Sequence, residues 1–127
     1  MDAPVFVFKK HDEHLAIARH SPDAAWPAWA RGRFVSVTRT RAELSVICAQ
    51  KHVPATVKCE RDKVAFGIVG VVPMTSIGIL AQLCGALAAA AVPVFAISTY
   101  DTDYLLVSAD RVEATTAALL ALGHRVE

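Results

Sequence analysis

Two acidic residues, Asp101 and Asp103, stand two positions apart in a polar run at residues 98–103. Ionised carboxylates only accept hydrogen bonds, so this pair could bind an amine or a guanidinium group. The pair could also act as acid and base, but no nucleophile beside a base accompanies it. A plain turn explains the same residues, because Asp and Ser are frequent in turns. Composition alone therefore leaves a binding loop and a plain turn both open.

A second candidate is the uncharged run at 72–78, which opens a predicted helix. The first turn of that helix contains no Asp or Glu, so its backbone N–H groups and its positive end remain available to an anion. A ligand carboxylate would suit that position, and Gly78 would let the ligand come close. Capping of the helix by Thr75 or Ser76 is the alternative explanation for those two residues.

Other chemistries find little support in the sequence. His11 and His14 flank two acids and could bind a metal at that spacing, but we expect a solvated loop. The three cysteines, Cys48, Cys59 and Cys84, lack C-x-x-C spacing, which favours free thiols in a reducing compartment. No phosphate-binding glycine loop and no H-E-x-x-H motif is present. We therefore expect no catalytic residue, no metal and no cofactor.

Composition excludes several classes of partner. A chain of 127 residues that is 54% hydrophobic and 20% charged should fold as one domain or two very small ones. A net charge of +1 shows no basic excess and argues against nucleic acid. The apolar run 77–97 is long enough to cross a membrane, but Pro93 and a change from Ala and Leu to Val, Phe and Ile indicate a helix passing into a strand. The charged stretch 9–13 argues against a signal peptide, so we expect a cytoplasmic protein.

The second half of the chain predicts a regular order of elements. The expected elements are strand 64–72, helix 75–91, strand 92–99, strand 103–108, helix 110–122 and strand 124–127. This βαββαβ order is ferredoxin-like and predicts an α+β fold, an antiparallel sheet with helices on one face. In the last helix we expect Asp110 and Glu113 to form a capping pair and Gly123 to mark the end.

The helix at 75–91 has two unusual faces. Its predicted core stripe consists of residues three and four apart: Ile77, Leu80, Cys84, Leu87 and Ala91. The opposite face carries small or uncharged residues: Gly78, Gln82, Gly85 and Ala89. Small residues permit close approach of another backbone, so we expect the first half of the chain or another subunit to bury this face. An exposed alanine-rich face is the alternative, because alanine favours helix by itself.

The first half is less regular. Apolar runs at 5–8 and 15–18 predict one hairpin, and runs at 34–48 predict a second, with a short helix at 24–30 between them. We therefore expect an N-terminal module, residues 1–58, with the order ββαββ, and a C-terminal module, residues 59–127. The polar stretch 51–62 is the expected linker.

Two stretches, 34–48 and 78–107, carry a resemblance to a known family, and the run Ile97-Ser-Thr-Tyr-Asp-Thr-Asp-Tyr104 is its most specific piece. The chain resembles the small bacterial proteins with two ACT-type modules, which are related to the regulatory ACT domains of aspartate kinases and to the CASTOR-type arginine sensors of animals. The resemblance implies two ferredoxin-like modules side by side in a non-catalytic regulatory protein. It also implies a homodimer and a regulated protein partner.

In such proteins an amino acid binds between the loop that opens the first helix and the edge strand of a neighbouring module. By position, the resemblance points to nine ligand-binding residues: Thr75, Ser76, Ile77 and Gly78 for the carboxylate and amine ends, and Ser98, Thr99, Tyr100, Asp101 and Asp103 around the side chain. The alternatives are an oligomerisation module without a ligand, and a small enzyme that uses the two acids. Cationic amino acids fit two carboxylates, but the sequence does not name the ligand.

Overall fold

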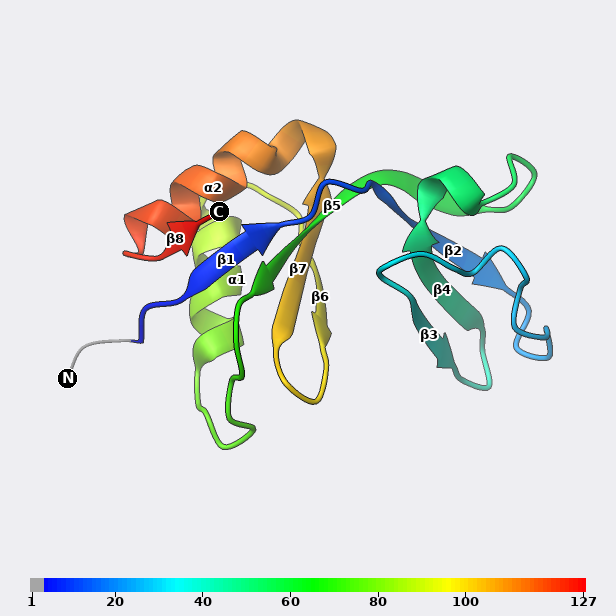
Figure 1. Ribbon diagram of the computed structural model, residues 1–127, viewed down its shortest axis with the longest axis horizontal. Coiled ribbons are helices and arrows are strands. Elements are labelled where there is room, and N and C mark those ends of the chain that lie inside the picture. Colours follow the sequence, from blue (N-terminus) through cyan, green and yellow to red (C-terminus); the bar gives the residue numbers. More distant parts are fainter. Residues whose placement is uncertain (1–3) are drawn as a thin grey trace. The chain divides into compact units, whose positions relative to one another are not determined.

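The computed structural model describes residues 4–127, and this range holds eight strands, two α-helices and two short 3-10 helices (Figure 1). In chain order the elements are β1 (Val7–Lys10), β2 (Leu15–His20), β3 (Ser36–Arg39), β4 (Leu44–Ala49), η1 (Gln50–His52), β5 (Cys59–Ile68), α1 (Ile79–Ala89), β6 (Phe95–Ser98), β7 (Asp103–Ser108), η2 (Ala109–Arg111), α2 (Val112–Ala121) and β8 (Arg125–Val126). No helix of the described range is long and apolar enough to cross a membrane.

The chain forms two compact units. Unit 1 joins the segment up to residue 12 to residues 64–127, and unit 2 comprises residues 13–63. The structure thus divides the chain differently from the expected modules 1–58 and 59–127, because the first strand belongs with the C-terminal segment. Strand β5 contributes its first half to unit 2 and its second half to unit 1.

Unit 1 contains the predicted βαββαβ order, now with the N-terminal strand added. Strand β1 pairs antiparallel with β5 and parallel with β8, so Phe8 lies opposite both Ile68 and Val126. On the other side of β5 lies β7, which pairs antiparallel with β6. The predicted hairpin of residues 5–8 with 15–18 is therefore wrong. Burial explains the observed partner, because Phe8 is fully buried in the core of unit 1.

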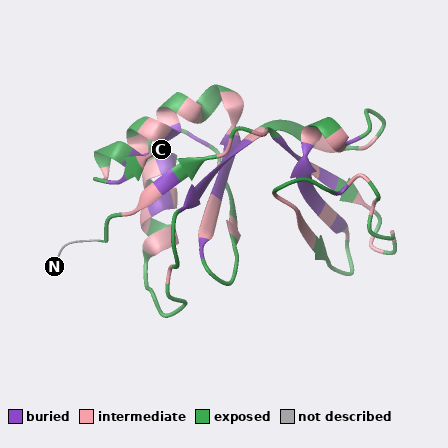
Figure 2. Ribbon diagram, in the orientation of Figure 1, coloured by how far each residue is buried: buried purple, intermediate pink, exposed green. Residues whose placement is uncertain are grey.

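The core of unit 1 lies between the sheet and the two α-helices. Alternate residues of β5, namely Val64, Phe66 and Ile68, are buried in one cluster with Leu83 and Leu87 of α1 (Figure 2). Every second residue of a strand points to the same face of the sheet, and helix residues four apart lie on the same face of the helix, so these residues can pack against each other. Leu105, Val107 and Leu119 complete the cluster from β7 and α2.

Helix α1 begins at Ile79, four residues after the predicted start, and this shifts its buried stripe. Its N-cap residue Gly78 has a φ of 81°, a left-handed conformation that ends any regular helix on its N-terminal side. Ile77 therefore lies outside the helix and is 95% exposed. Ala91 is also exposed, so the predicted stripe is wrong at both ends, and Leu83 takes the central buried position.

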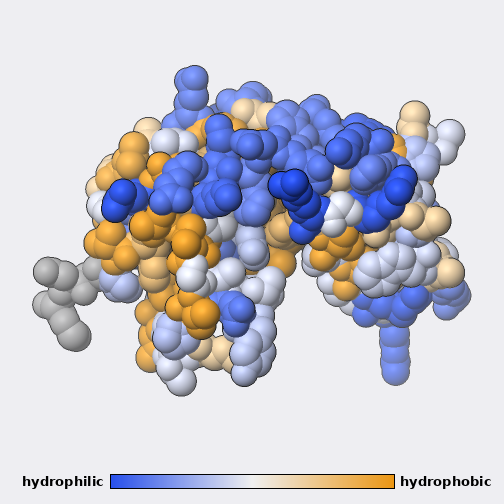
Figure 3. Space-filling model, in the orientation of Figure 1, coloured by the Kyte–Doolittle hydropathy of each residue, from blue (hydrophilic) through white to orange (hydrophobic). Residues whose placement is uncertain are grey.

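Among the described residues of unit 1, little covers the opposite face of α1, where only Gln82 of the four residues is partly buried. Gly78, Gly85 and Ala89 are exposed, and no atom lies within 4 Å of where a Cβ would stand at Gly78 or Gly85. Figure 3 shows apolar residues gathered over the part of unit 1 that holds the helices. The expected burial of this face is thus not met within unit 1.

Helix α2 follows the short η2 turn, and its two ends differ in how well they were predicted. Asp110 lies inside η2 and no side chain caps α2, so the predicted capping pair is wrong. The predicted end at Gly123 is confirmed. Gly123 has a φ of 94°, its N–H donates to the Leu120 carbonyl at 2.9 Å, and the His124 N–H donates to the Leu119 carbonyl at 3.1 Å. These two bonds form a Schellman motif.

Unit 2 is a four-stranded antiparallel sheet with β2 between β4 and the first half of β5, and β3 outside β4. The predicted hairpin in 34–48 is confirmed as β3 and β4. The predicted helix at 24–30 is wrong, since this segment is irregular with a turn at residues 28–29. Pro27 explains the difference, because proline in the fourth position of a helix has no N–H to donate and clashes with the preceding turn. Part of the expected linker 51–62 is also regular, because η1 extends to His52 and β5 begins at Cys59.

Candidate functional site

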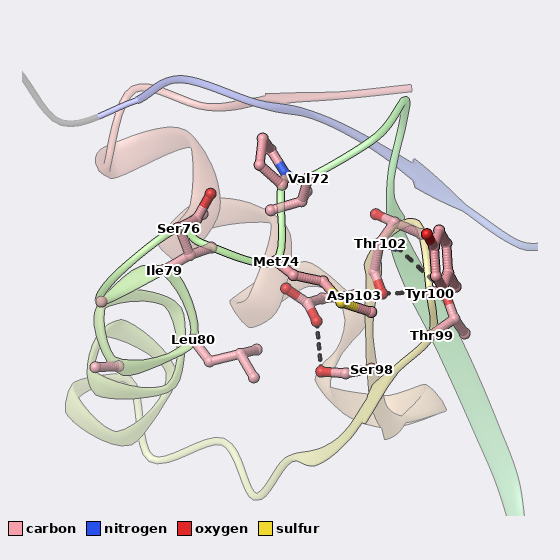
Figure 4. Close-up of a pocket in the computed structure, with 13 residues that line it drawn as sticks. Val72, Met74, Ser76, Ile79, Leu80, Ser98, Thr99, Tyr100, Thr102 and Asp103 are labelled. Carbon is pink, nitrogen blue, oxygen red and sulfur yellow. Dashed lines mark hydrogen bonds between the residues drawn. The ribbon is translucent and has the colours of Figure 1, made fainter.

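A pocket of about 410 Å³ lies in unit 1, where the start of α1 faces the tip of the β6–β7 hairpin (Figure 4). Three segments line it: the loop after β5, the first turn of α1 and the hairpin tip. The lining residues are Val72, Pro73, Met74, Ser76, Gly78, Ile79, Leu80, Ala81, Ser98, Thr99, Tyr100, Thr102 and Asp103. The pocket thus joins the two candidate runs of the sequence.

The helix side of the pocket presents uncapped backbone. No side chain caps α1 and its first turn contains no acidic residue. The Gln82 N–H donates to the Gly78 carbonyl at 3.0 Å, which leaves the N–H groups of Ile79 and Leu80 ahead of the first helical bond. The positive end of the helix dipole lies at the same place. Capping by Thr75 or Ser76, the alternative explanation for those residues, does not occur.

The hairpin side presents a carboxylate. Ser98 and Asp103 lie opposite each other in the β6–β7 register, and the Ser98 hydroxyl donates to Asp103 Oδ1 at 2.5 Å (Figure 4). Asp103 therefore keeps its second carboxylate oxygen for another donor. Tyr100 and Met74 add large exposed apolar side chains to the pocket rim.

The hairpin tip is tied to β5 and to the following loop. The buried Thr102 hydroxyl donates to the Ile68 carbonyl at 2.8 Å, and the Val72 N–H donates to the Asp101 carbonyl at 2.6 Å. Across the tip, the Thr99 N–H donates to the Thr102 carbonyl at 2.8 Å, and the Thr102 N–H donates back to the Thr99 hydroxyl at 3.2 Å. These bonds hold the two sides of the pocket in one geometry.

The structure brings six of the nine predicted ligand-binding residues together. Ser76, Gly78, Ser98, Thr99, Tyr100 and Asp103 line the pocket. Thr75 and Ile77 do not; both are exposed outside it. Asp101 lines a different hollow. Seven lining residues were not among the nine predicted, because the first turn of α1 lies four residues later than expected and Thr102 looks like an ordinary turn residue. The seven are Val72, Pro73, Met74, Ile79, Leu80, Ala81 and Thr102.

The histidines of the 11–14 loop separate in the structure. His11 belongs to unit 1 and packs near the Tyr104 ring, with ring centroids 5.9 Å apart. Burial and the nearby Lys9 charge lower the pKa of His11. His14 belongs to unit 2, where its Nδ1 lies 3.5 Å from the carboxylate of Asp62. Residues 4–127 hold no group of three side chains that could bind a metal.

A mixed α+β unit, with a mainly antiparallel sheet, two helices on one face and a pocket between a helix start and a hairpin tip, defines an ACT-like fold. The model of the ACT domain matches residues 58–121, and a second model, for an N-terminal domain, matches residues 13–56. The crystal structure of a protein from Agobacterium tumefaciens is 34% identical with a TM-score of 0.92, over 98% of this chain and 94% of that one. The chain belongs to the ACT domain family.

More distant structures share the fold alone. The regulatory subunit of aspartate kinase from Thermus thermophilus is 14% identical with a TM-score of 0.62, over 91% of this chain and 96% of that one. Aspartate kinase from Synechocystis is 15% identical with a TM-score of 0.67, over 97% of this chain and 28% of that one. The resemblance to aspartate kinase regulatory domains is thereby confirmed, whereas a link to animal arginine sensors is not shown. No curated protein sequence matches the chain.

Proposed function

We propose that this protein is a non-catalytic regulator that binds an amino acid in the pocket of unit 1. One observation carries the proposal: the uncapped start of α1 faces the carboxylate of Asp103 across a pocket of about 410 Å³. The ligand carboxylate would accept from the N–H groups of Ile79 and Leu80, and the ligand ammonium would donate to Asp103. Ser98 would orient the Asp103 carboxylate for that bond.

The family supports this role. ACT-like structures that share the fold include a regulatory subunit described as ligand-free, so a protein of this shape regulates an enzyme in at least that case. The lining of the pocket contains no histidine, lysine or cysteine to act as nucleophile or base beside the Ser98–Asp103 pair, which fits binding without turnover.

A second copy of the chain would close the pocket. Strand β6 is an edge strand of unit 1, and its residues Phe95–Ser98 carry no charge, as expected of an edge that pairs with another strand. The adjacent exposed face of α1 is also uncharged around Gly85. In a homodimer the ligand would favour the packing that encloses it, and a protein partner would respond to that packing.

Calorimetric titration with the twenty amino acids tests the proposal. Asp103→Asn should weaken the binding of the best ligand by about ten- to a hundredfold, because a charge-assisted hydrogen bond is lost. Asp110→Asn is the matched control, since Asp110 is an exposed acid outside the pocket. Absence of binding by all twenty, with folded protein, would refute the proposal.

The exposed small-residue face of α1 favours a second candidate, an oligomerisation module without a ligand. Light scattering of Gly85→Leu separates the two. This candidate requires the variant to dissociate an oligomer while no amino acid raises the melting temperature of the native chain.

A further inference from the structure

Unit 1 contains a second hollow, of about 370 Å³, which the ligand pocket does not include. It is lined from three places: β1 and its end, the end of β5, and the hairpin tip. Lys9 pairs with Gly67 in the register of β1 and β5, next to the pair of Phe8 and Ile68. Since Phe8 and Ile68 face the core beneath the helices, Lys9 and Gly67 face the other side of the sheet. This hollow therefore opens on the helix-free face.

Gly67 and Tyr104 shape the floor of the hollow. A Cβ at Gly67 would lie 2.6 Å from Cε1 of the Tyr104 ring, so the ring lies directly on the glycine backbone. Gly70, with a φ of 91°, turns the chain away at the end of β5. The result is a flat aromatic and backbone surface with polar groups around it.

The charges around this floor are opposite in sign. Lys9 and Asp101 are both exposed, both line the hollow, and neither takes part in any ion pair within residues 4–127. The pKa of His11, which also lines the hollow, is lowered first by burial and then by the Lys9 charge, and both effects disfavour its charged form. The charges that line the hollow therefore cancel, one positive and one negative.

We propose that this hollow is a second binding site, for a small zwitterion whose carboxylate binds Lys9 and whose ammonium binds Asp101. A ligand with both charges satisfies both walls at once, and its carbon atoms would pack on the Tyr104 ring. A simple anion or cation would satisfy one wall and leave the other charge unpaired. The site does not depend on the amino-acid pocket, because its charged residues are different.

The two sites share one wall. Thr99 and Thr102 line both hollows, and their mutual hydrogen bonds form the hairpin tip. A ligand on one side of this tip therefore acts on residues that the other ligand contacts. This arrangement couples the two sites if both are occupied.

Nuclear magnetic resonance of the full ¹⁵N-labelled chain tests the second site. Titration with glycine and then with each of the other amino acids should shift the amide signals of Gly67, Val69 and Gly70. Acetate and methylamine, which each carry one of the two charges, should shift them less at equal concentration. Signals of Ile79–Ala81 report the first pocket, and the Lys9→Gln variant, which does not alter the lining of that pocket, separates binding at the second site from coupling through the shared tip.

Charge-removing variants complete the test. Lys9→Gln and Asp101→Asn should each weaken binding at Gly67–Gly70 by about two- to fivefold, as expected for exposed ion pairs. Lys10→Gln is the matched control, because the next residue of β1 does not line the hollow. The proposal is overturned if no amino acid shifts these amides, if acetate and methylamine shift them equally well, or if Lys9→Gln and Asp101→Asn behave like Lys10→Gln.

Discussion

Lowering the pH should reduce the free energy of unfolding of unit 1, because the histidine His124 is buried there. His124 is 3% exposed, its Nδ1 accepts the Phe6 N–H at 3.0 Å, and its ring stacks on Phe6 at 5.6 Å and meets the edge of Phe8 at 5.5 Å. An accepting Nδ1 places the proton of the neutral ring on Nε2, which has no hydrogen-bond partner among the described residues. Protonation would add a donor at Nδ1, where the Phe6 N–H already points.

The sign of the pH effect follows from burial. Desolvation lowers the pKa of His124 below its ordinary value of 6.5, so the unfolded chain takes up a proton before the folded chain does. The contribution of neutral His124 to the free energy of unfolding is therefore complete above pH 6.5, the pKa of the unfolded chain. It is lost as the pH falls through the lower pKa of the folded chain. His11, whose pKa is also lowered, adds to the same slope.

His124→Phe isolates the effect because it keeps an aromatic ring and removes both the acceptor and the proton. We expect it to lower the free energy of unfolding at neutral pH by about 1–2 kcal/mol, the cost of leaving the partly buried Phe6 N–H without its partner. It should also flatten the dependence of that free energy on pH below about pH 6.5, where the unfolded chain takes up the proton first. Urea unfolding followed by helical circular dichroism reports unit 1, which contains both α-helices. His52→Gln in unit 2 is the control, and an unchanged slope in His124→Phe would refute the reasoning.

Three further substitutions test the packing of unit 1. Leu83→Ala should lower the free energy of unfolding by about 2–5 kcal/mol, because Leu83 is fully buried. Leu120→Ala, at a 53% exposed position, should change it by less than about 0.5 kcal/mol. Similar values for the two variants in urea titrations would contradict the assigned core. Gly123→Ala should cost about 1–2 kcal/mol because of its left-handed φ, and a melting temperature equal to that of the native chain would show that α2 ends differently. Gly67→Ala should lower the free energy of unfolding by about 1–3 kcal/mol, because the new methyl group overpacks against Tyr104. In thermal scans, the double variant Gly67→Ala, Tyr104→Ala should recover part of the lost stability.

Local patterns in the sequence were sufficient for much of unit 1. Strand β7 occupies the predicted residues 103–108, since apolar residues there are flanked by a polar turn and a helix start. Gly123 ends α2 as predicted, because few other residues tolerate the left-handed conformation. Both features depend on a few neighbouring residues and need no tertiary information.

Pairing between distant segments could not be predicted in the same way. The partners of β1 lie about 60 and 118 residues away in the chain, in β5 and β8, and nothing local distinguishes them from the nearby β2. Asp101 and Asp103 show a subtler case. Two residues apart in a strand would share a face, but the turn at 99–102 breaks the alternation, and the two carboxylates line different hollows.

The insertion of β1 between β5 and β8 has a practical meaning for anyone who dissects this protein. A fragment cut to the ACT domain match, residues 58–121, would lose two neighbouring strands of its sheet and expose the backbone of β5 along one whole edge. Such a fragment should aggregate. On the ribosome, unit 1 likewise cannot close until its last strand emerges, so the inserted residues 13–63 have time to fold first.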